Sequence, residues 1–254
     1  MRWKHSHASV TGKAHTDRGE SGQDFSRAGT VRVDGDEFFI GIAADGAGST
    51  TDGGKGAEIA CGELFGEITR TVQLSSDLSR ITDQDVRSWI TASRDAILAC
   101  ARDHGKQPRE FACTILGTLA GSGHAVFFQI GDGAIVTGTG QECRTIFWPA
   151  QGEYANSTYF ITDEEFAGHL QILHEEAPDG IALFTDGLQN LALSFGQMKA
   201  HPGFFLPLFD ALEKDTGDGF PAFSGTLERF LLRDDISARS DDDKTLVLAV
   251  HVKG

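Results

Sequence analysis

Short apolar runs, rich in β-branched and aromatic residues, recur along the chain, and turn-forming residues bound each of them. This pattern is typical of strands that enter a buried sheet. It predicts strands over residues 36–45, 111–121, 124–132, 134–140, 180–186 and 244–252.

Helical spacing lies between the first two of these runs. Residues 53–72 carry apolar side chains at the spacing of an amphipathic helix. Residues 82–105 predict a second helix, with Thr82 as its N-cap and Gly105 at its end. Residues 195–232 predict shorter helices interrupted by proline and glycine.

The order of these elements predicts the architecture. A strand comes first, followed by two long helices, a run of hairpin-joined strands, further helices and a last strand. Grouped strands and grouped helices are typical of antiparallel sheets covered by helices, an α+β fold, rather than of a βαβ repeat. Because no internal repeat or long linker interrupts the sequence, we expect one domain over residues 1–254.

Charge and cysteine usage narrow the class of protein. A net charge of -15 argues against nucleic acid or an anionic membrane as partner, because both require a basic face. The sequence has no signal-peptide core near residue 1 and no apolar run of membrane-spanning length. Its four cysteines are scattered without a C-x-x-C pair, so we expect reduced thiols and a cytoplasmic protein.

Three strand-like runs end in Asp-Gly, at Asp45, Asp132 and Asp186. The glycine after each carboxylate allows a sharp turn, and Asp-Gly is also the commonest hairpin signal. Strand-like residues follow Asp132 at once, so a tight hairpin explains that pair. Helical or glycine-rich sequence follows Asp45 and Asp186, so these two are the better candidates for a functional role.

Further carboxylates lie at other element ends, namely Asp24 in "GQDFS" and the triplet at 241–243 that precedes the last strand. The triplet is either a solvated loop beside an edge strand or part of a cation site. If the strand ends converge, a cation must offset the repulsion, and oxygen ligands select Mg²⁺ or Mn²⁺. No His/Cys set favours zinc.

Taken in order, "GQD", "AADGAG", "ACTILG", "QIGDG", "FTDGL" and "DDKTL" resemble the motifs of the metal-dependent protein phosphatases of type 2C, the PPM family, over nearly the whole chain. The similarity is closest to the compact bacterial branch of that family. It implies a four-layer α-β-β-α sandwich, with two antiparallel sheets flanked by helices. It also implies two Mn²⁺ or Mg²⁺ ions at one end of the sheets, and a third that is held more weakly.

The resemblance assigns roles to the acidic residues. Asp45 would bridge both ions, and the carbonyl of Gly46 would bind one of them. Asp186 and Asp242 would hold the other ion. In "DDKTL" the distance to the last strand's threonine selects Asp242 as the ligand and places Asp243 where relatives have asparagine.

Two aspartates receive weaker roles from the resemblance. Asp132 would contribute to the third metal site, and Asp24 would orient the attacking water from outside the ligand set. Asp241 is expected to be a solvated loop charge.

The chain also departs from the family pattern. Gln23 stands where many relatives have glutamate, which would weaken the hold on one ion. Ala47 stands where eukaryotic relatives have a candidate acid histidine, so water or His15 would protonate the leaving group. The phosphate-binding arginine of relatives has no clear counterpart, although Arg18 and Lys55 are candidates.

These features predict hydrolysis of phosphoserine and phosphothreonine in proteins, with a Ser/Thr protein kinase or its targets as partners. An inactive phosphoprotein-binding module on the same fold is the alternative, for which Gln23 is the argument. A small-molecule phosphatase is a second rival. The segment "GEYANSTYFIT" at 152–162 is a candidate flap or substrate edge. Substrate identity, preference for Ser/Thr over Tyr, physiological metal and oligomeric state stay open.

Overall fold

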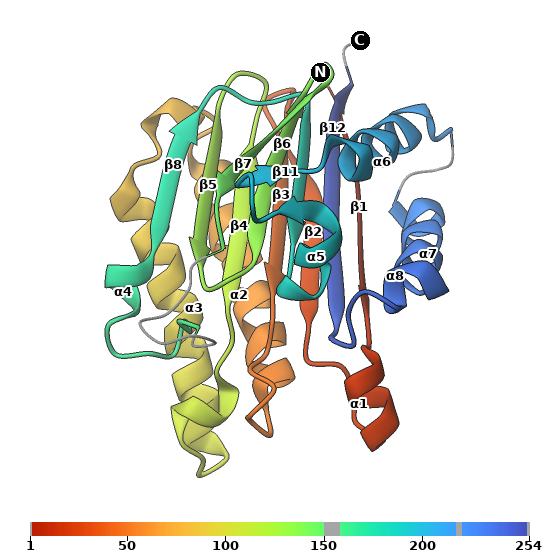
Figure 1. Cartoon of the computed structure of the whole chain (residues 1–254). Coiled ribbons are helices and arrows are strands. Elements are labelled where there is room, and N and C mark those ends of the chain that lie inside the picture. Colours follow the sequence, from red (N-terminus) through yellow and green to blue (C-terminus); the bar gives the residue numbers. More distant parts are fainter. Residues whose placement is uncertain (1, 150–157, 217–219, 253–254) are drawn as a thin grey trace.

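Two antiparallel sheets face each other in this computed structural model, which describes residues 2–149, 158–216 and 220–252 (Figure 1). In that part of the chain each sheet has five strands. The first sheet has the order β1 (Arg2–Val10), β12 (Lys244–Val252), β9 (Gly180–Phe184), β6 (Ala134–Thr139), β7 (Glu142–Phe147). The second has the order β2 (Phe25–Val33), β3 (Asp36–Ala44), β4 (Ile115–Ala120), β5 (Ala125–Ile130), β8 (Gln171–Glu175).

Helices cover the outer face of each sheet (Figure 1). On the second sheet lie α2 (Gly53–Leu74), α3 (Asp83–Asp103) and the short α4 (Phe166–His169). On the first sheet lie α5 (Gln189–Ala192), α6 (Pro202–Lys214), α7 (Phe220–Leu231) and α8 (Asp234–Ser237). Four further helical pieces of three to six residues are α1 (Lys13–Arg18), η1 (Leu78–Arg80), η2 (Pro108–Phe111) and η3 (Asp186–Leu188). The predicted four-layer α+β sandwich is confirmed.

Strand β3 illustrates how the sequence encodes these layers. Ile40 and Ile42 pack with the helices α2 and α3, whereas Phe39 and Ala43 pack between the two sheets. Successive side chains of a strand point to opposite faces. Because both faces of β3 are covered, its sequence is an almost continuous apolar run.

The six predicted strands are the interior strands of the two sheets. Within these two sheets, four strands were not predicted by the apolar pattern, and they are the four edge strands β1, β2, β7 and β8. Edge strands are partly exposed and carry polar and charged residues, which removes the apolar signal. In β2, for example, Arg27 and Thr30 are exposed to solvent.

Two other predictions were wrong in detail. The strand expected from residue 111 begins at Ile115, because Pro108 opens the single turn η2. Residues 195–200, expected to be helical, belong to a hairpin of β10 (Leu193–Ser194) and β11 (Lys199–Ala200). Met198 turns the chain there with a φ of 49°.

Asp132-Gly133 does not form the expected tight hairpin. The strands on either side of it, β5 and β6, belong to different sheets, so the chain crosses between sheets at this point. Gly131 permits the crossing with a φ of 111°. The hairpin explanation therefore fails, and Asp132 stands where the chain crosses from one sheet to the other.

None of the helices in the described residues is both long enough and apolar enough to cross a membrane.

Candidate active site

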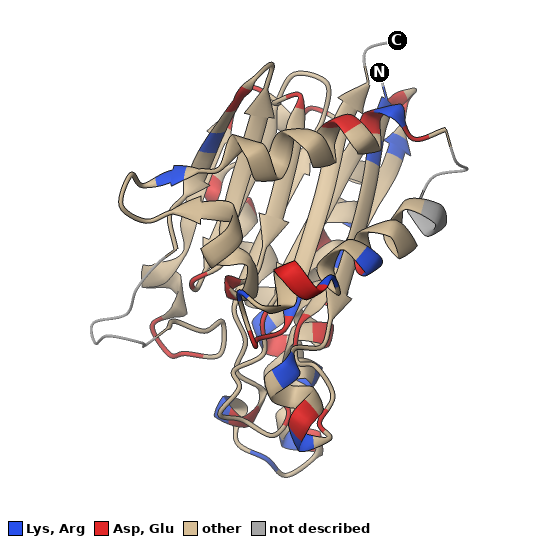
Figure 2. Ribbon diagram, turned by 45° about the vertical axis from the view of Figure 1, so that its right-hand side comes forward, with Lys and Arg blue, Asp and Glu red and all other residues tan. Residues whose placement is uncertain are grey.

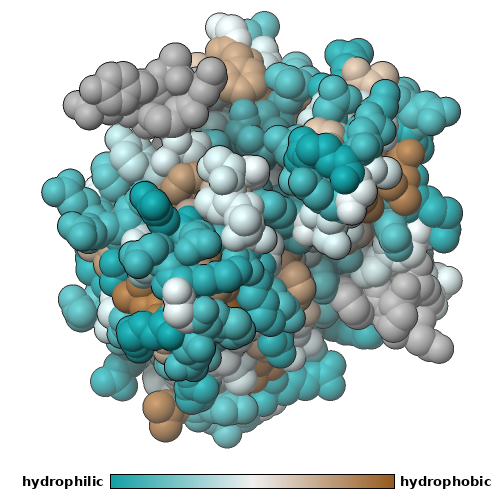
Figure 3. Space-filling model, turned by 90° about the horizontal axis from the view of Figure 1, so that it is seen from below, coloured by the Kyte–Doolittle hydropathy of each residue, from teal (hydrophilic) through white to brown (hydrophobic). Residues whose placement is uncertain are grey.

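At the lower end of the sandwich the layer between the sheets changes from apolar to polar. Side chains two positions apart along a strand share a face. Leu116, Phe127, Leu183 and Val247 line the interior between the sheets, and Thr114, Gln129, Thr185 and Thr245 are the next residues on the same faces. These four, the polar layer, are each at most 2% exposed. Seen from below, the surface at this end is mostly hydrophilic (Figure 3).

The polar layer positions the ends of two strands. Thr114 Oγ1 accepts a hydrogen bond of 3.0 Å from the backbone N–H of Asp45. Gln129 Nε2 donates to the carbonyls of Gly131 and Gly133 at 3.2 and 2.8 Å. Through these two bonds Gln129 fixes the backbone on both sides of Asp132, where the chain crosses between the sheets.

Thr185 joins the two sheets at the same level. Its hydroxyl donates to the carboxylate of Asp24 at 2.7 Å and accepts from the N–H of Thr245 at 3.1 Å. Asp24 precedes β2 of the second sheet, whereas Thr185 directly follows β9 and Thr245 lies in β12, both strands of the first sheet. The sequence reasoning missed the polar layer, although a threonine or glutamine that ends an inward-facing apolar series is a detectable signal.

Five aspartates, Asp24, Asp45, Asp132, Asp186 and Asp242, gather next to this layer at the lower ends of the strands, where acidic residues lie (Figure 2). The carboxyl group of Asp45 lies next to those of Asp24 and Asp186, whose charges act on it. Burial, followed by the charges of Asp24 and Asp186, raises the pKa of Asp45 well above its ordinary value. Two carboxyl groups in contact must share a proton or a cation.

Burial also raises the pKa of Asp24 to about 7, against hydrogen bonds from Thr185 and Thr245 that lower it. The pKa of Asp186 is raised to about 7 by burial and then by the charges of Asp132 and Asp242.

Asp132 extends the group toward the solvent. Burial raises its pKa, a hydrogen bond from Thr158 lowers it, and the charge of Asp242 raises it again. The carbonyl of Asp132 accepts a hydrogen bond of 2.6 Å from Gln189 Nε2. Thr158 belongs to the "GEYANSTYFIT" segment, of which residues 152–157 lie outside the described part of the chain, so the flap role stays a prediction.

The aspartate triplet has one buried and two exposed members. Asp243 is 2% exposed and accepts hydrogen bonds from the N–H groups of Gly12 and Gln23, both at 2.6 Å, and from His15 Nδ1 at 3.0 Å. Asp241 and Asp242 are both exposed, and the charge of Asp242 is among the main causes that raise the pKa of Asp45. Lys244 Nζ donates to the carbonyl of Asp242 at 2.8 Å.

This donor set fits a hard divalent cation. Among the described residues no three acidic, histidine or cysteine side chains are already arranged around one point as metal ligands. The carboxylates nevertheless meet in pairs at Asp45, and Mg²⁺ keeps several waters, so it needs few direct protein ligands. Gln23 Oε1 is buried without a hydrogen-bond partner, which supplies one more oxygen. At Gly46 a Cβ atom would lie 2.3 Å from the backbone carbon of Gly53, so only glycine brings the backbone this close.

Comparison with known proteins gives the family. The model of protein phosphatase 2C matches residues 11–231. The chain belongs to the protein phosphatase 2C family. Serine/threonine-protein phosphatase 3 of Escherichia coli (strain K12) is 32% identical over 252 residues, which cover 98% of this chain and 99% of that protein.

Solved structures of low sequence identity share the protein phosphatase 2C fold. Stp1 from Staphylococcus aureus matches with a TM-score of 0.63 at 14% identity, covering 100% of this chain and 96% of that one. The catalytic domain of PstP, in complex with two manganese ions, matches with a TM-score of 0.60 at 14% identity, covering 99% of each chain. The predicted family and enzyme class, a protein phosphatase, are confirmed, and the non-catalytic module is not favoured.

His15 was predicted as a possible acid, and Arg18 and Lys55 as possible phosphate ligands, in this protein phosphatase 2C chain. His15 is buried, whereas the two basic residues are exposed. His15 is 4% exposed and bound to Asp243, with its Nε2 atom buried and unpartnered. Arg18 and Lys55 are exposed and form local ion pairs at 2.6 and 2.7 Å with Glu20 and Glu58. Neither basic residue contacts the carboxylates through an interaction within the described residues, and their roles stay predictions.

The raised pKa values predict that Mn²⁺ stabilises this phosphatase more at pH 7.5 than at pH 5. Asp24 and Asp186 titrate near 7 when folded but near 3.8 in their ordinary state. Between pH 3.8 and pH 7 the metal-free folded state therefore binds more protons than the unfolded state, and its stability falls as the pH rises through this range. These protons must be released before metal binds. The measurement is the shift in Tm on adding Mn²⁺ at each pH.

This difference measurement has a built-in control. Burial lowers the pKa of His7 to about 4, which destabilises the protein at low pH with or without metal. Because the effect is common to both samples, it cancels in the shift. An equal or larger Mn²⁺ shift at pH 5 would contradict the prediction.

Proposed function

We propose that this protein hydrolyses phosphoserine and phosphothreonine in proteins, with two Mn²⁺ or Mg²⁺ ions as cofactors. The observation that carries the proposal is the contact of Asp45 with both Asp24 and Asp186 at the end of the sandwich. Repulsion of this kind destabilises a fold unless the groups share a proton or a cation, and a metal site supplies the cation. The relative at 32% identity is a serine/threonine phosphatase, which supports this choice of substrate class.

The ions would be held by Asp45, the carbonyl of Gly46, Asp186 and Asp242, with Asp132 at a weaker third site. When bound, they supply a water of lowered pKa and neutralise charge on the transferring phosphoryl group. Three ligand carboxylates carry about three negative charges and two divalent ions about four positive ones, so the loaded site attracts phosphate. Without cations the same carboxylates repel it.

The chain's own residues then orient the reaction. Asp24, held by Thr185, orients the attacking water. His15 is enclosed and fixes Asp243, so the leaving alkoxide takes its proton from water rather than from His15. Gln23 offers a neutral oxygen, which holds an ion more weakly than a carboxylate would.

The biological setting follows from the substrate. Phosphoserine and phosphothreonine are made by protein kinases, so we place the enzyme opposite a Ser/Thr kinase or the targets of that kinase. Its four cysteines are unpaired, which suits the reducing cytoplasm. We treat residues 1–254 as one phosphatase domain.

Chelation tests the proposed function. Dephosphorylation of a phosphothreonine peptide is expected to vanish in excess EDTA and to return on adding Mn²⁺ or Mg²⁺, because the reaction needs the cations. A phosphotyrosine peptide of the same sequence measures the Ser/Thr preference. Full activity in EDTA, or no activity on any phosphopeptide with either metal, would overturn the proposal.

A further inference from the structure

A groove of about 710 Å³ adjoins the candidate metal centre. It begins at Ala47, directly after the Asp45-Gly46 turn, and its far wall comes from residues 160–163. Hydroxyl groups of Ser49, Thr50, Thr51 and Thr162 line it. A groove of this size and polarity beside the reacting centre can take a peptide segment on either side of a phosphorylated residue.

Backbone pairing ties the groove to the site. Asp45 is paired with Thr114 through a hydrogen bond of 2.8 Å, and Gly46 forms a bridge with Cys113. The next bond joins the N–H of Ala47 to the carbonyl of Ala112 at 2.9 Å. The groove wall therefore extends directly from the strand end that carries Asp45.

The charged residues of the groove differ in whether their side chains form hydrogen bonds with the described residues. Glu110 accepts a hydrogen bond from the N–H of Gln107 at 2.9 Å, and Asp163 accepts one from the N–H of Phe160 at 2.8 Å. Both carboxylates thus stabilise their own loops. Arg109 is exposed, and its guanidinium has no hydrogen bond or ion pair with the residues that the structure describes.

We propose that Arg109 binds a second anionic group of the phosphoprotein substrate, a carboxylate or a second phosphate, near the phosphorylated residue. The inference rests on the proposed function and adds a preference for acidic substrate segments. A guanidinium matches carboxylate and phosphate through two parallel hydrogen bonds. Such a contact would locally offset the repulsion between an acidic substrate and a chain with a net charge of -15.

The chain itself limits where the second anion lies. Arg109 lies five positions before Thr114, the partner of Asp45, so their Cα atoms are at most about 18 Å apart. An extended peptide advances about 3.3 Å per residue. The second anionic group is therefore expected within about five residues of the phosphorylated one.

The test uses three phosphothreonine peptides that differ at one nearby position, which holds glutamate, phosphoserine or glutamine. The position is scanned on both sides of the phosphothreonine. The readout is kcat/KM for the glutamate or phosphoserine peptide divided by kcat/KM for the glutamine peptide, within each variant. The intact protein is expected to prefer an anionic peptide about tenfold, and Arg109→Ala to lose that preference.

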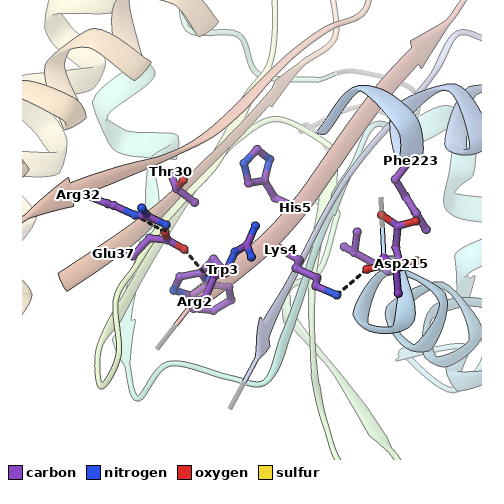
Figure 4. A pocket seen from close by; sticks show the side chains of 11 residues that line it. Arg2, Trp3, Lys4, His5, Thr30, Arg32, Glu37, Asp215 and Phe223 are labelled. Atoms are coloured by element: carbon purple, nitrogen blue, oxygen red, sulfur yellow. Dashed lines mark hydrogen bonds and ion pairs between the residues drawn. The ribbon is translucent and has the colours of Figure 1, made fainter. Parts of the chain in front are cut away.

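Arg2→Ala is the matched control, because it removes the same charge. Arg2 is an exposed arginine that lines a cavity at the opposite end of the sandwich, beside Lys4 and Arg32 (Figure 4). This variant is expected to keep the full preference. Arg109→Lys, which retains the charge but not the paired hydrogen bonds, is expected to keep only part of it.

The peptide comparison identifies the kind of anion that binds, and it distinguishes failure of this inference from failure of the proposed function. A preference confined to the phosphoserine peptide identifies the second anion as phosphate, and a preference for glutamate as well identifies a general anion site. An intact protein without any preference, or Arg109→Ala with the preference retained, overturns the inference while the proposed function stands. If no peptide is hydrolysed with Mn²⁺, the proposed function fails and the inference falls with it.

Discussion

Asp45→Asn is expected to lower phosphatase activity about a thousandfold and, at the same time, to raise the Tm of the metal-free protein. The two effects have one origin. Asp45 meets the carboxyl groups of both Asp24 and Asp186, and its pKa is raised by burial and by these charges. An amide removes the repulsion but is a poorer cation ligand.

The gain in stability distinguishes a ligand site from an ordinary buried aspartate. For a chain of this size each kcal/mol of relieved repulsion raises Tm by about 2–4 °C. In the same variant, Mn²⁺ should no longer raise Tm, since stabilisation by a ligand requires binding. Scanning calorimetry in EDTA and in Mn²⁺, with a peptide assay alongside, measures all three quantities.

Asp36→Asn is the control for this experiment. Asp36 lies at the opposite end of the same strand β3 and is exposed. It is expected to change neither activity nor the Mn²⁺ shift. If Asp45→Asn retained more than a tenth of the activity, or if it lowered the Tm of the metal-free protein, the bridging role would be wrong.

The aspartate triplet gives the second large effect. Asp242→Asn is expected to lower activity about a hundredfold or more, whereas Asp241→Asn should leave most of it. Both residues are exposed, so neither substitution disturbs packing. Asp242 is the one whose charge reaches Asp45 and Asp186. Steady-state kinetics at saturating Mn²⁺ compares them, and equal losses would mean that the register of the motif is wrong.

Asp243→Ala serves as the third member of that series and should act on stability. The substitution leaves the N–H groups of Gly12 and Gln23 without their acceptor, and His15 without its partner. Each buried group left unpaired costs about 1–3 kcal/mol. Chemical denaturation is expected to show this loss, and Asp242→Asn should not show it.

The pattern of apolar runs predicted the interior strands of the two sheets but not their edge strands. All six strands inferred from apolar runs are interior strands, and all four edge strands went unpredicted. Thr82 begins α3 with a capping box, as its sequence indicated. An interior strand has both faces covered, so its sequence is a recognisable apolar run. An edge strand is partly exposed, so its sequence contains polar residues and resembles that of a loop.

For the acidic residues, too, the sequence predicted one part of the site and tertiary contacts determined the rest. Their types and their positions after apolar strands were sufficient to predict an oxygen-rich cation site, because repelling carboxylates need a counter-charge wherever they converge. The crossing at Asp132, the burial of Asp243 and the position of Arg109 in the groove depended on contacts between segments far apart in the chain. Such contacts arise from packing of the two sheets, which no local pattern records. The sequence therefore sufficed to predict the chemistry of the site, and the tertiary structure decided which aspartates are buried and which are exposed.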